Sequence, residues 1–275
     1  MQGGKQLGEK FQNLNLKDAF LFGAALQDEE TCRLILEIIL GFRVGKIKVH
    51  AEKALLFSSD FRSLRLDIYA SDEMQVEYNV EMQNADEKNL ALRARFHQAE
   101  MDVTSLLPGE DFSKLRPGYV IFICTFDPFG KSLYRYTFEN RCLEDDFSLE
   151  DKTRKIFLST KGKNAGQVPA LLVDFLGYVE NSTDAYVQHI PDGPVHKIHE
   201  KIGILKKNRE WERRYMRFEE LLQQSEQQGR EEGSRQMLAL VEAMLAAGEV
   251  SEIPRLKTEP VFLQQMLEKY YLQER

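Results

Sequence analysis

Two short segments separated by a turn constrain the fold of this chain more than any other feature. In residues 64–69 (LRLDIY) and 76–83 (VEYNVEMQ), apolar residues occupy the even positions and mostly polar residues the odd positions. A period of two is the side-chain period of a β-strand, and it indicates strands with one face on a core. Ser71-Asp72-Glu73 between the segments predicts a turn, so the two segments predict a β-hairpin.

A helical pattern precedes this hairpin. Apolar residues recur at helical spacing between Lys17 and Leu40, and Gly41 predicts the end of the helix. The acidic run at residues 28–30 interrupts the pattern, so we expect two helices, the second beginning near Asp28 or Thr31. Residues 44–57 are expected to be extended.

Further patterns follow the hairpin. Residues 89–107 predict an amphipathic helix whose apolar stripe consists of Leu92, Phe96, Ala99, Val103 and Leu106. The continuous apolar run at residues 119–126 predicts a strand buried on both faces. Residues 135–142 and 153–159 predict further strands, and a helix begins at Pro169. Before Asp127 the order of elements is αβββαβ, which predicts an α/β fold in which helices flank a mixed sheet.

The composition changes after about Val195, and this predicts a C-terminal helical arm. We expect a polar N-terminal segment (1–15), an α/β domain (16–190) and the arm (195–275). Within the arm, residues 200–228 predict a long polar helix, which Gly229 and Gly233 punctuate before two shorter helices. Trp211, Tyr215, Phe218 and Leu222 form an apolar seam that would dock on the main domain or on another subunit.

Composition and charge narrow the class of protein. The chain has 275 residues and a formal net charge of -7, so any contact with nucleic acid requires a local basic patch. Three cysteines without a CxxC spacing argue against a disulfide framework and a thiolate zinc site, and suit a reducing cytoplasm. No window approaches the ~18 apolar residues of a membrane span. We therefore expect a soluble cytoplasmic protein with no membrane contact.

The odd positions of the hairpin are the candidate chemical site. If both apolar faces lie on one core, the polar faces meet on the other side. Asp67 then lies near Asn79 and diagonally within reach of Glu81, with Gln83 two residues further on. Such an oxygen-rich pocket suits Mg²⁺, which binds carboxylates, waters and substrate phosphate. The alternative interpretation is an ordinary solvated strand face.

The order of these motifs resembles the PD-(D/E)XK nuclease superfamily, and within it the bacterial PD-(D/E)XK nuclease family transposases, relatives of the recombination-promoting nucleases. The matching motifs are Lys17-Asp18-Ala19-Phe20, Leu66-Asp67-Ile68, Val80-Glu81-Met82-Gln83 and Leu92-Arg93-Ala94-Arg95-Phe96, followed by the Gly-spaced tail from Gly229. The resemblance covers most of the chain from about Leu16. It implies a restriction-endonuclease-like core.

The resemblance also implies roles for particular residues. Asp67 and Glu81 would be the metal ligands, and Gln83 would stand where the superfamily usually has Lys. A glutamine can orient water or a phosphate oxygen, but it can neither take a proton nor neutralise charge. The superfamily often has another acid on its first helix, for which Glu30 and Glu37 are both candidates.

The helix after the motif carries Arg93, Arg95 and His97. Arg93 and His97 lie four residues apart and share a face, whereas Arg95 lies about 160° away. Either Arg93 or Arg95 would contact phosphate or fix an active-site carboxylate. The alternative is that both are surface or ion-pairing residues. No role is expected for His97.

Together these features predict a Mg²⁺-dependent deoxyribonuclease, in which Mn²⁺ can substitute, acting on DNA in recombination or mobile-element movement. The expected partners are DNA and, through the C-terminal helices, further copies of the chain. The alternative is a catalytically weak or inactive nuclease-fold protein that binds DNA or protein, which the acidic balance and Gln83 favour.

Overall fold

The computed structural model describes residues 8–50 and 68–271. Its centre is a six-stranded sheet in the order β1-β2-β3-β4-β6-β5. The strands are β1 (Ile47–Val49), β2 (Ile68–Asp72), β3 (Glu77–Gln83), β4 (Gly118–Cys124), β5 (Arg135–Phe138) and β6 (Thr153–Ser159). β3, β4 and β6 are parallel to one another, whereas β1, β2 and β5 are antiparallel to their neighbours. The sheet is therefore mixed.

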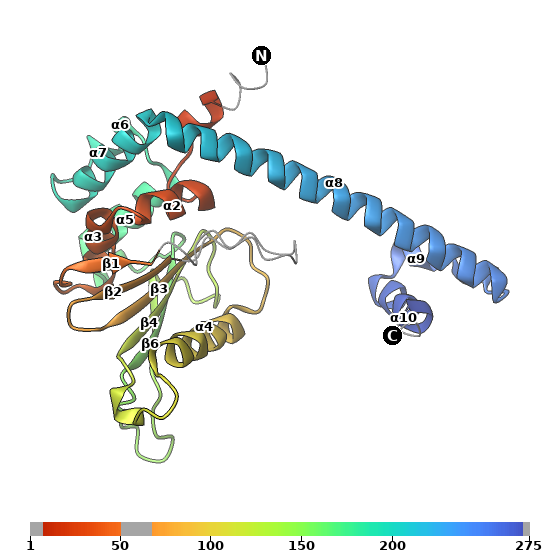
Figure 1. The fold of residues 1–275 in the computed structure, drawn as a ribbon, viewed down its shortest axis with the longest axis horizontal. Coiled ribbons are helices and arrows are strands. Elements are labelled where there is room, and N and C mark those ends of the chain that lie inside the picture. The colour runs from red at the N-terminus through yellow and green to blue at the C-terminus, as the bar shows by residue number, and fades with distance from the viewer. Residues whose placement is uncertain (1–7, 51–67, 272–275) are drawn as a thin grey trace. The chain divides into compact units, whose positions relative to one another are not determined.

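Helices cover both faces of this sheet (Figure 1). The α-helices are α2 (Ala19–Leu26), α3 (Glu29–Leu40), α4 (Leu90–Ser105), α5 (Ala170–Glu180), α6 (Asp184–Val187), α7 (Pro194–Lys207), α8 (Arg209–Ala246), α9 (Arg255–Thr258) and α10 (Pro260–Tyr271). Short 3-10 helices occur at Phe112–Lys114, Ala165–Gln167 and Val250–Glu252. The expected α/β class, with a mixed sheet and flanking helices, is confirmed.

Two apolar clusters show which helices cover which face. The larger cluster joins the even residues of β2 and β3, such as Ile68 and Val80, to side chains of α2, α3, α5 and α7. The smaller cluster joins Val120, Phe122 and Cys124 of β4 to Leu90, Ala94 and Met101 of α4. Because β4 contributes to both clusters, it is buried on both faces, as its continuous apolar run predicts.

Local sequence explains the two opening helices. The Asp28 side chain accepts a hydrogen bond from the Thr31 amide at 2.9 Å and so caps the N-terminus of α3. Gly41 ends α3 with a φ of 79°, a left-handed conformation that glycine adopts without strain. The expected break between two helices near Asp28 is confirmed.

The β2–β3 hairpin also follows the sequence pattern. Ile68 pairs with Val80 and Tyr69 with Asn79, so even residues face even residues across the pair. The Asp72 side chain accepts from the amides of Met74 and Val76 at 3.0 and 2.9 Å, which closes the turn. Residues 64–67 of the expected first strand, and residues 51–57 of the expected extended stretch, lie outside the described residues.

The expected orientation of the helix after the hairpin is wrong. On α4 the predicted core stripe is exposed: Leu92 is 60%, Phe96 54% and Val103 79% accessible. The buried face instead carries Leu90, Ala94, His97, Gln98 and Met101. Both stripes follow helical spacing, and the polar residues of the sheet, described below, select the second one.

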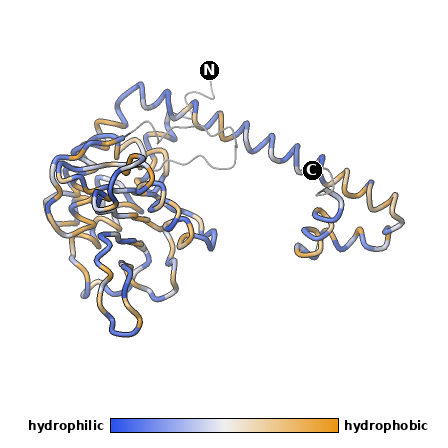
Figure 2. The backbone as a smooth tube through the Cα atoms, turned by 60° about the horizontal axis from the view of Figure 1, so that its bottom comes forward, coloured by the Kyte–Doolittle hydropathy of each residue, from blue (hydrophilic) through white to orange (hydrophobic). Residues whose placement is uncertain are grey.

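The long C-terminal helix also differs from expectation. α8 runs without interruption through Gly229 and Gly233, which were expected to punctuate it. Figure 2 shows that the middle of this helix is hydrophilic and its C-terminal end hydrophobic. At that end Leu240 and Met244 are buried with Leu256 and with residues of α10. A helix interior tolerates glycine at a cost of about 1 kcal/mol, which the rest of α8 offsets.

Residue contacts divide the chain into two units, Met1–Met216 and Arg217–Arg275. The first unit extends beyond residue 190, the expected end of the α/β domain, because α7 contributes Val195, Ile198 and Ile202 to the larger cluster. Tyr215 is also buried in this unit, in ring contact with Phe11 and Phe20. In the described part of the chain, no helix is long and apolar enough to cross a membrane.

Candidate functional site

The odd residues of β3 form a buried polar face beneath α4. Asn79 is fully buried, Glu81 is 2% exposed and Gln83 is 8% exposed. The interpretation of this face as solvated is therefore wrong. A carboxylate withdrawn from water needs a counter-charge or hydrogen bonds, so the neighbours of Glu81 decide what this face can do.

Arg93 and His97 of α4 hold the Glu81 carboxylate. The Arg93 guanidinium donates one hydrogen bond to Glu81 Oε2 and a second, 2.8 Å long, to Gln83 Oε1. His97 Nε2 lies 2.5 Å from Glu81 Oε1, and His97 Nδ1 lies 3.1 Å from the exposed carboxylate of Glu100. Gln83 in turn donates to the Ala85 carbonyl at 2.9 Å. Each oxygen of the Glu81 carboxylate thus has a contact with a side chain of α4.

The same interface contains further buried polar side chains. Both side-chain polar atoms of Asn79 are buried and have no hydrogen-bond partner within residues 8–50 and 68–271. Gln98 is 7% exposed and donates to Asp102 at 3.1 Å, one turn further along α4. The interface between β3 and α4 is therefore polar beyond Glu81 as well, because α4 places the Gln98 amide there.

The polar face explains why α4 turns its apolar stripe outward. Turning Leu92 and Phe96 inward would place hydrocarbon against Glu81 and leave its charge without a partner, at a cost of several kcal/mol. The face with Arg93 and His97 satisfies that charge. The buried carboxylate thus fixes the rotation of the helix.

The structure brings some of the predicted site residues together and separates others. Glu81, Gln83 and Arg93 are in direct contact. Arg95 lies on the exposed side of α4. Asp67 lies outside the described residues; in the sequence it directly precedes β2, whose Ile68 pairs with Val80, the neighbour of Glu81.

Glu30 and Glu37, the two candidates for the first-helix acid of the site, pair with residues other than Glu81. Glu30 pairs with Lys201 of α7 at 2.7 Å, and Glu37 accepts from Arg33 and from the Val44 amide. Both belong to α3, which packs against the sheet face opposite α4. In the described part of the chain, neither contacts Glu81.

His97 is the residue that the sequence reasoning missed. Its spacing of four from Arg93 places both residues on one face of the helix, yet no role was expected for His97 from the sequence. The signal was the shared face itself: once Arg93 is inward, His97 must be inward as well, where it is 1% exposed.

Charged groups lie at the end of β3, β4 and β6 beyond Gln83. The Asn84 side chain donates to the Lys17 carbonyl, and Lys17 and Lys161 both pair with Glu180, at 2.9 and 2.6 Å. Burial pushes the pKa of the Glu180 carboxyl upward, but hydrogen bonds from Lys161, Thr160 and Lys17 outweigh burial and lower that pKa to about 2. This edge of the sheet therefore carries two lysines whose charge is partly offset by one carboxylate.

Cys124 lies at the C-terminal end of β4, next to Gln83 in register. Burial, with the neighbouring carboxylate of Asp86, raises the pKa of this thiol to about 12. It is therefore protonated at neutral pH and serves as a core side chain and not as a nucleophile.

The donor set fits a dication only in part. Among the described residues, no three His, Cys, Asp or Glu side chains are grouped as a metal site. Glu81 is a suitable hard oxygen ligand, and Gln83 and Asn79 add amide oxygens nearby. Completing a carboxylate pair requires Asp67, the residue next to β2. Both oxygens of Glu81 now interact with Arg93 and His97, so a bound cation would compete with them.

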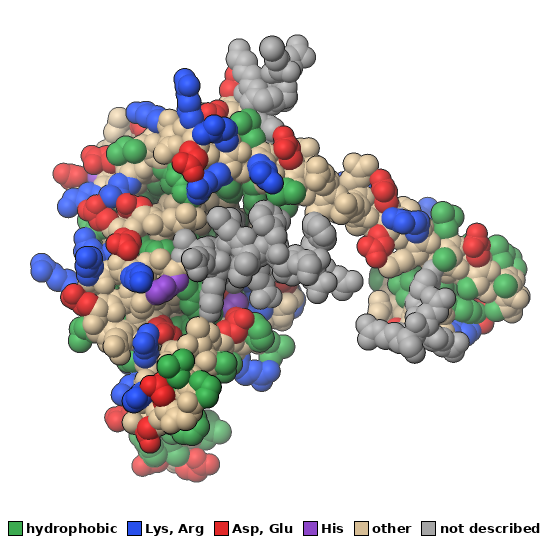
Figure 3. All heavy atoms as spheres, in the orientation of Figure 1, with side chains coloured by type: hydrophobic (Ala, Val, Ile, Leu, Met, Phe, Trp, Pro, Cys, Tyr) green, Lys and Arg blue, Asp and Glu red, His purple; other side chains and the backbone are tan. Residues whose placement is uncertain are grey.

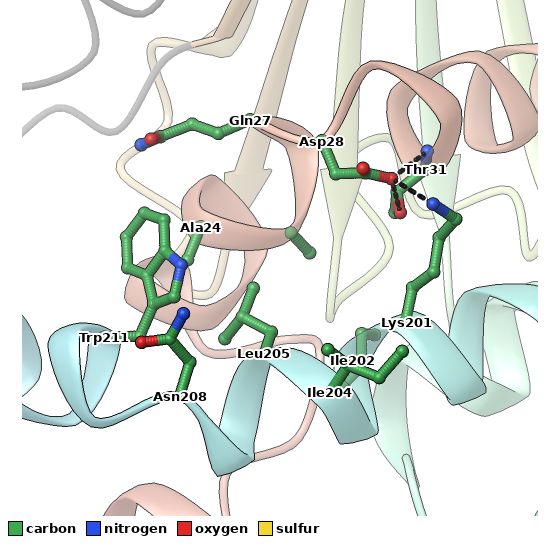
Figure 4. Close-up of a pocket in the computed structure, with 11 residues that line it drawn as sticks. Ala24, Gln27, Asp28, Thr31, Lys201, Ile202, Ile204, Leu205, Asn208 and Trp211 are labelled. Carbon is green, nitrogen blue, oxygen red and sulfur yellow. Dashed lines mark hydrogen bonds and ion pairs between the residues drawn. The ribbon is translucent and has the colours of Figure 1, made fainter.

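The molecule also has a cavity of about 420 Å³, lined by residues of α2, α3, α7 and the start of α8 (Figure 4). Its one acid, Asp28, caps α3 and pairs with Lys201 at 2.9 Å. Trp211 and Leu205 are among the residues of its apolar wall. Because its carboxylate is already satisfied and α3 lies on the sheet face opposite α4, this cavity is separate from the Glu81 site.

Comparison with known proteins gives one result for the family. The model of the family described as PD-(D/E)XK nuclease family transposase matches residues 20–166, which is more than half of the chain. The match includes Glu81, Gln83, Arg93 and His97. No curated protein and no solved structure matches the chain significantly.

Proposed function

Because the chain belongs to the PD-(D/E)XK nuclease family transposases, we propose that it is a divalent-metal-dependent DNA endonuclease that hydrolyses phosphodiester bonds, in recombination or mobile-element movement. The observation that carries this proposal is the buried Glu81 carboxylate, held by Arg93 and His97 on the strand next to β2. An apolar residue would fill this position at lower cost, so a retained buried charge favours a functional role.

In this proposal Asp67 and Glu81 hold the cation, which is Mg²⁺ with Mn²⁺ as a substitute. When bound, the cation supplies an activated water and stabilises charge on the phosphodiester. Gln83 orients the water or a phosphate oxygen through its amide. Arg93 fixes Glu81 and Gln83 relative to each other through its two terminal guanidinium nitrogens.

A second candidate function rests on the same contacts. The Arg93 guanidinium already pairs with Glu81, and His97 covers its other oxygen, so that Glu81 is only 2% exposed. A carboxylate satisfied in this way can be a purely structural group in a fold that binds DNA or protein without cutting it. Gln83, which cannot take a proton from water, also favours this alternative.

Cleavage and cation binding separate the two functions. The full chain is incubated with plasmid DNA in Mg²⁺ or Mn²⁺, and each cation is titrated into the protein by calorimetry. We expect cleavage and a binding isotherm for the wild type. We expect Glu81→Gln and Asp67→Ala to abolish both, because each removes a charged ligand.

Glu77→Gln is the matched control, because Glu77 lies on the same face of β3 and pairs with Arg116 at 3.1 Å. It should cut like the wild type. Folding of every variant is checked by circular dichroism. If folded Glu81→Gln cuts at the wild-type rate, the site assignment is wrong. If the wild type binds DNA but neither cuts it nor binds the cation, the second function stands.

A further inference from the structure

The exposed face of α4 carries an apolar stripe of unusual regularity. Leu92, Phe96, Ala99, Val103 and Leu106 are separated by 4, 3, 4 and 3 residues, which is the spacing of a coiled-coil seam. Leu92, Phe96 and Val103 are each more than half exposed. Figure 3 shows hydrophobic side chains at the surface beside this helix. A soluble protein that exposes such a stripe usually buries it against a partner.

From this stripe we propose that α4 pairs with α4 of a second copy of the chain, antiparallel and about a two-fold axis. In this antiparallel arrangement, each seam residue faces the residue of the partner copy whose number brings the sum to 195. Phe96 then faces Ala99 of the partner copy, and Leu92 faces its Val103. The large ring then meets the smallest residue of the seam on both sides of the axis. Such matching of large with small side chains fills the interface without overlap.

The charges beside the seam favour a second copy over an unrelated partner. Arg95 and Asp102 are seven residues apart and therefore occupy the same edge of the seam, with opposite signs. In an antiparallel pair that edge faces the same edge of the other copy. Arg95 of each copy then meets Asp102 of the other, twice by symmetry. A surface that carries both halves of its own ion pair is self-complementary.

The pairing leaves the candidate site free. Arg93 and His97 contact Glu81 of the sheet, so neither is one of the apolar residues of the seam. The two copies would carry one Glu81 site on each side of the helix pair. The inference concerns this surface alone and holds whether or not the chain cuts DNA.

The test measures the mass of the full chain by sedimentation at several concentrations. We expect a dimer for the wild type. Phe96→Asp should weaken dimerisation at least 100-fold, because it buries two carboxylates in the seam. Arg95→Glu and Asp102→Arg should each weaken it about 10-fold, and the double variant, which restores opposite charges, should recover the wild-type dissociation constant.

Leu143→Asp is the control, since Leu143 is 95% exposed outside the seam, and it should remain dimeric. A monomeric wild type at about 50 µM, at the weak end of specific association, overturns the proposal. So does an oligomer that survives Phe96→Asp, because it forms through another surface. Charge reversals that do not compensate each other exclude the antiparallel pairing of Arg95 with Asp102 and overturn it as well.

Discussion

At the scale of single residues, one buried carboxylate organises the interface between the sheet and α4. Glu81 is only 2% exposed, so the stability of its carboxylate in the fold depends on its contacts with Arg93 and His97. Arg93 also bridges to Gln83 and lies over the Phe122 ring, 5.5 Å from its centroid. Losing this side chain therefore removes a charge partner, a hydrogen bond and packing in one step.

We predict a strong coupling between Arg93 and Glu81. Arg93→Met should lower the free energy of unfolding by about 3–5 kcal/mol, because it leaves a buried carboxylate without its cation. In the Glu81→Gln background the same substitution should cost much less, since no charge remains to be neutralised. Urea unfolding of the two single variants and the double variant measures the coupling energy.

A solvent-exposed ion pair provides the control for this cycle. Arg154 lies 3.5 Å from Glu139 and is half exposed, so Arg154→Met should change stability by less than about 1 kcal/mol. Equal costs of Arg93→Met in both backgrounds would show that packing on Phe122, and not charge, accounts for the effect.

At the scale of elements, α4 and α8 show two ways in which a helix pattern misleads. α4 carries two stripes of helical spacing, and pattern alone favours the more apolar one. α8 carries two glycines that resemble helix ends, yet the helix continues through both. In both helices the sequence pattern is present, but contacts and hydrogen bonds with the rest of the structure outweigh it.

We predict that alanine at the two glycines stabilises α8. A Cβ added at Gly229 or Gly233 meets no atom of the described residues within 4 Å. Each substitution should therefore stabilise the helix by about 0.5–1 kcal/mol, through the lower backbone entropy of alanine in the unfolded state. Hydrogen–deuterium exchange of the amides near these positions should slow several-fold.

Gly248 gives the opposite expectation in the same unit. Its φ of 76° is left-handed, so Gly248→Ala should destabilise by about 1–2 kcal/mol although its surroundings are equally open. Unchanged exchange rates in both Gly229→Ala and Gly233→Ala would indicate that the helix is interrupted there in solution.

At the scale of the whole molecule, the region that matches the family model ends earlier in the chain than the first folded unit. The match stops at residue 166, whereas the larger apolar cluster continues through α5 and α7. Leu172, Phe175 and Leu176 of α5 are fully buried. Side chains of this kind contribute about 1.5–3 kcal/mol each, so these three alone approach the total stability of an ordinary domain, about 5–15 kcal/mol.

We therefore predict that a fragment of residues 1–166 does not fold and that a fragment of residues 1–216 does. The second fragment retains α5, α7 and the buried Tyr215. Circular dichroism melts and size-exclusion chromatography of both fragments provide the measurement. A cooperative melt for residues 1–166 would mean that the larger cluster is not needed for folding.

The amino-acid sequence by itself determined the elements whose signals are local. Alternation predicts the β2–β3 hairpin, the apolar run predicts β4, and Asp28 and Gly41 predict the limits of α3, because strand pleat and helix caps act over a few residues. The motif around Glu81 and Gln83 also indicated the family, which the match to residues 20–166 bears out.

Only the tertiary structure decided which face of α4 is inside, and with it the partners of Glu81. Helical spacing allows either stripe, and the choice depends on a carboxylate of another element, twelve residues away from Arg93 along the chain. A buried charge costs more than several exposed apolar side chains, so the helix turned Arg93 and His97 inward and its apolar stripe outward. That balance exists only once strand and helix are packed together.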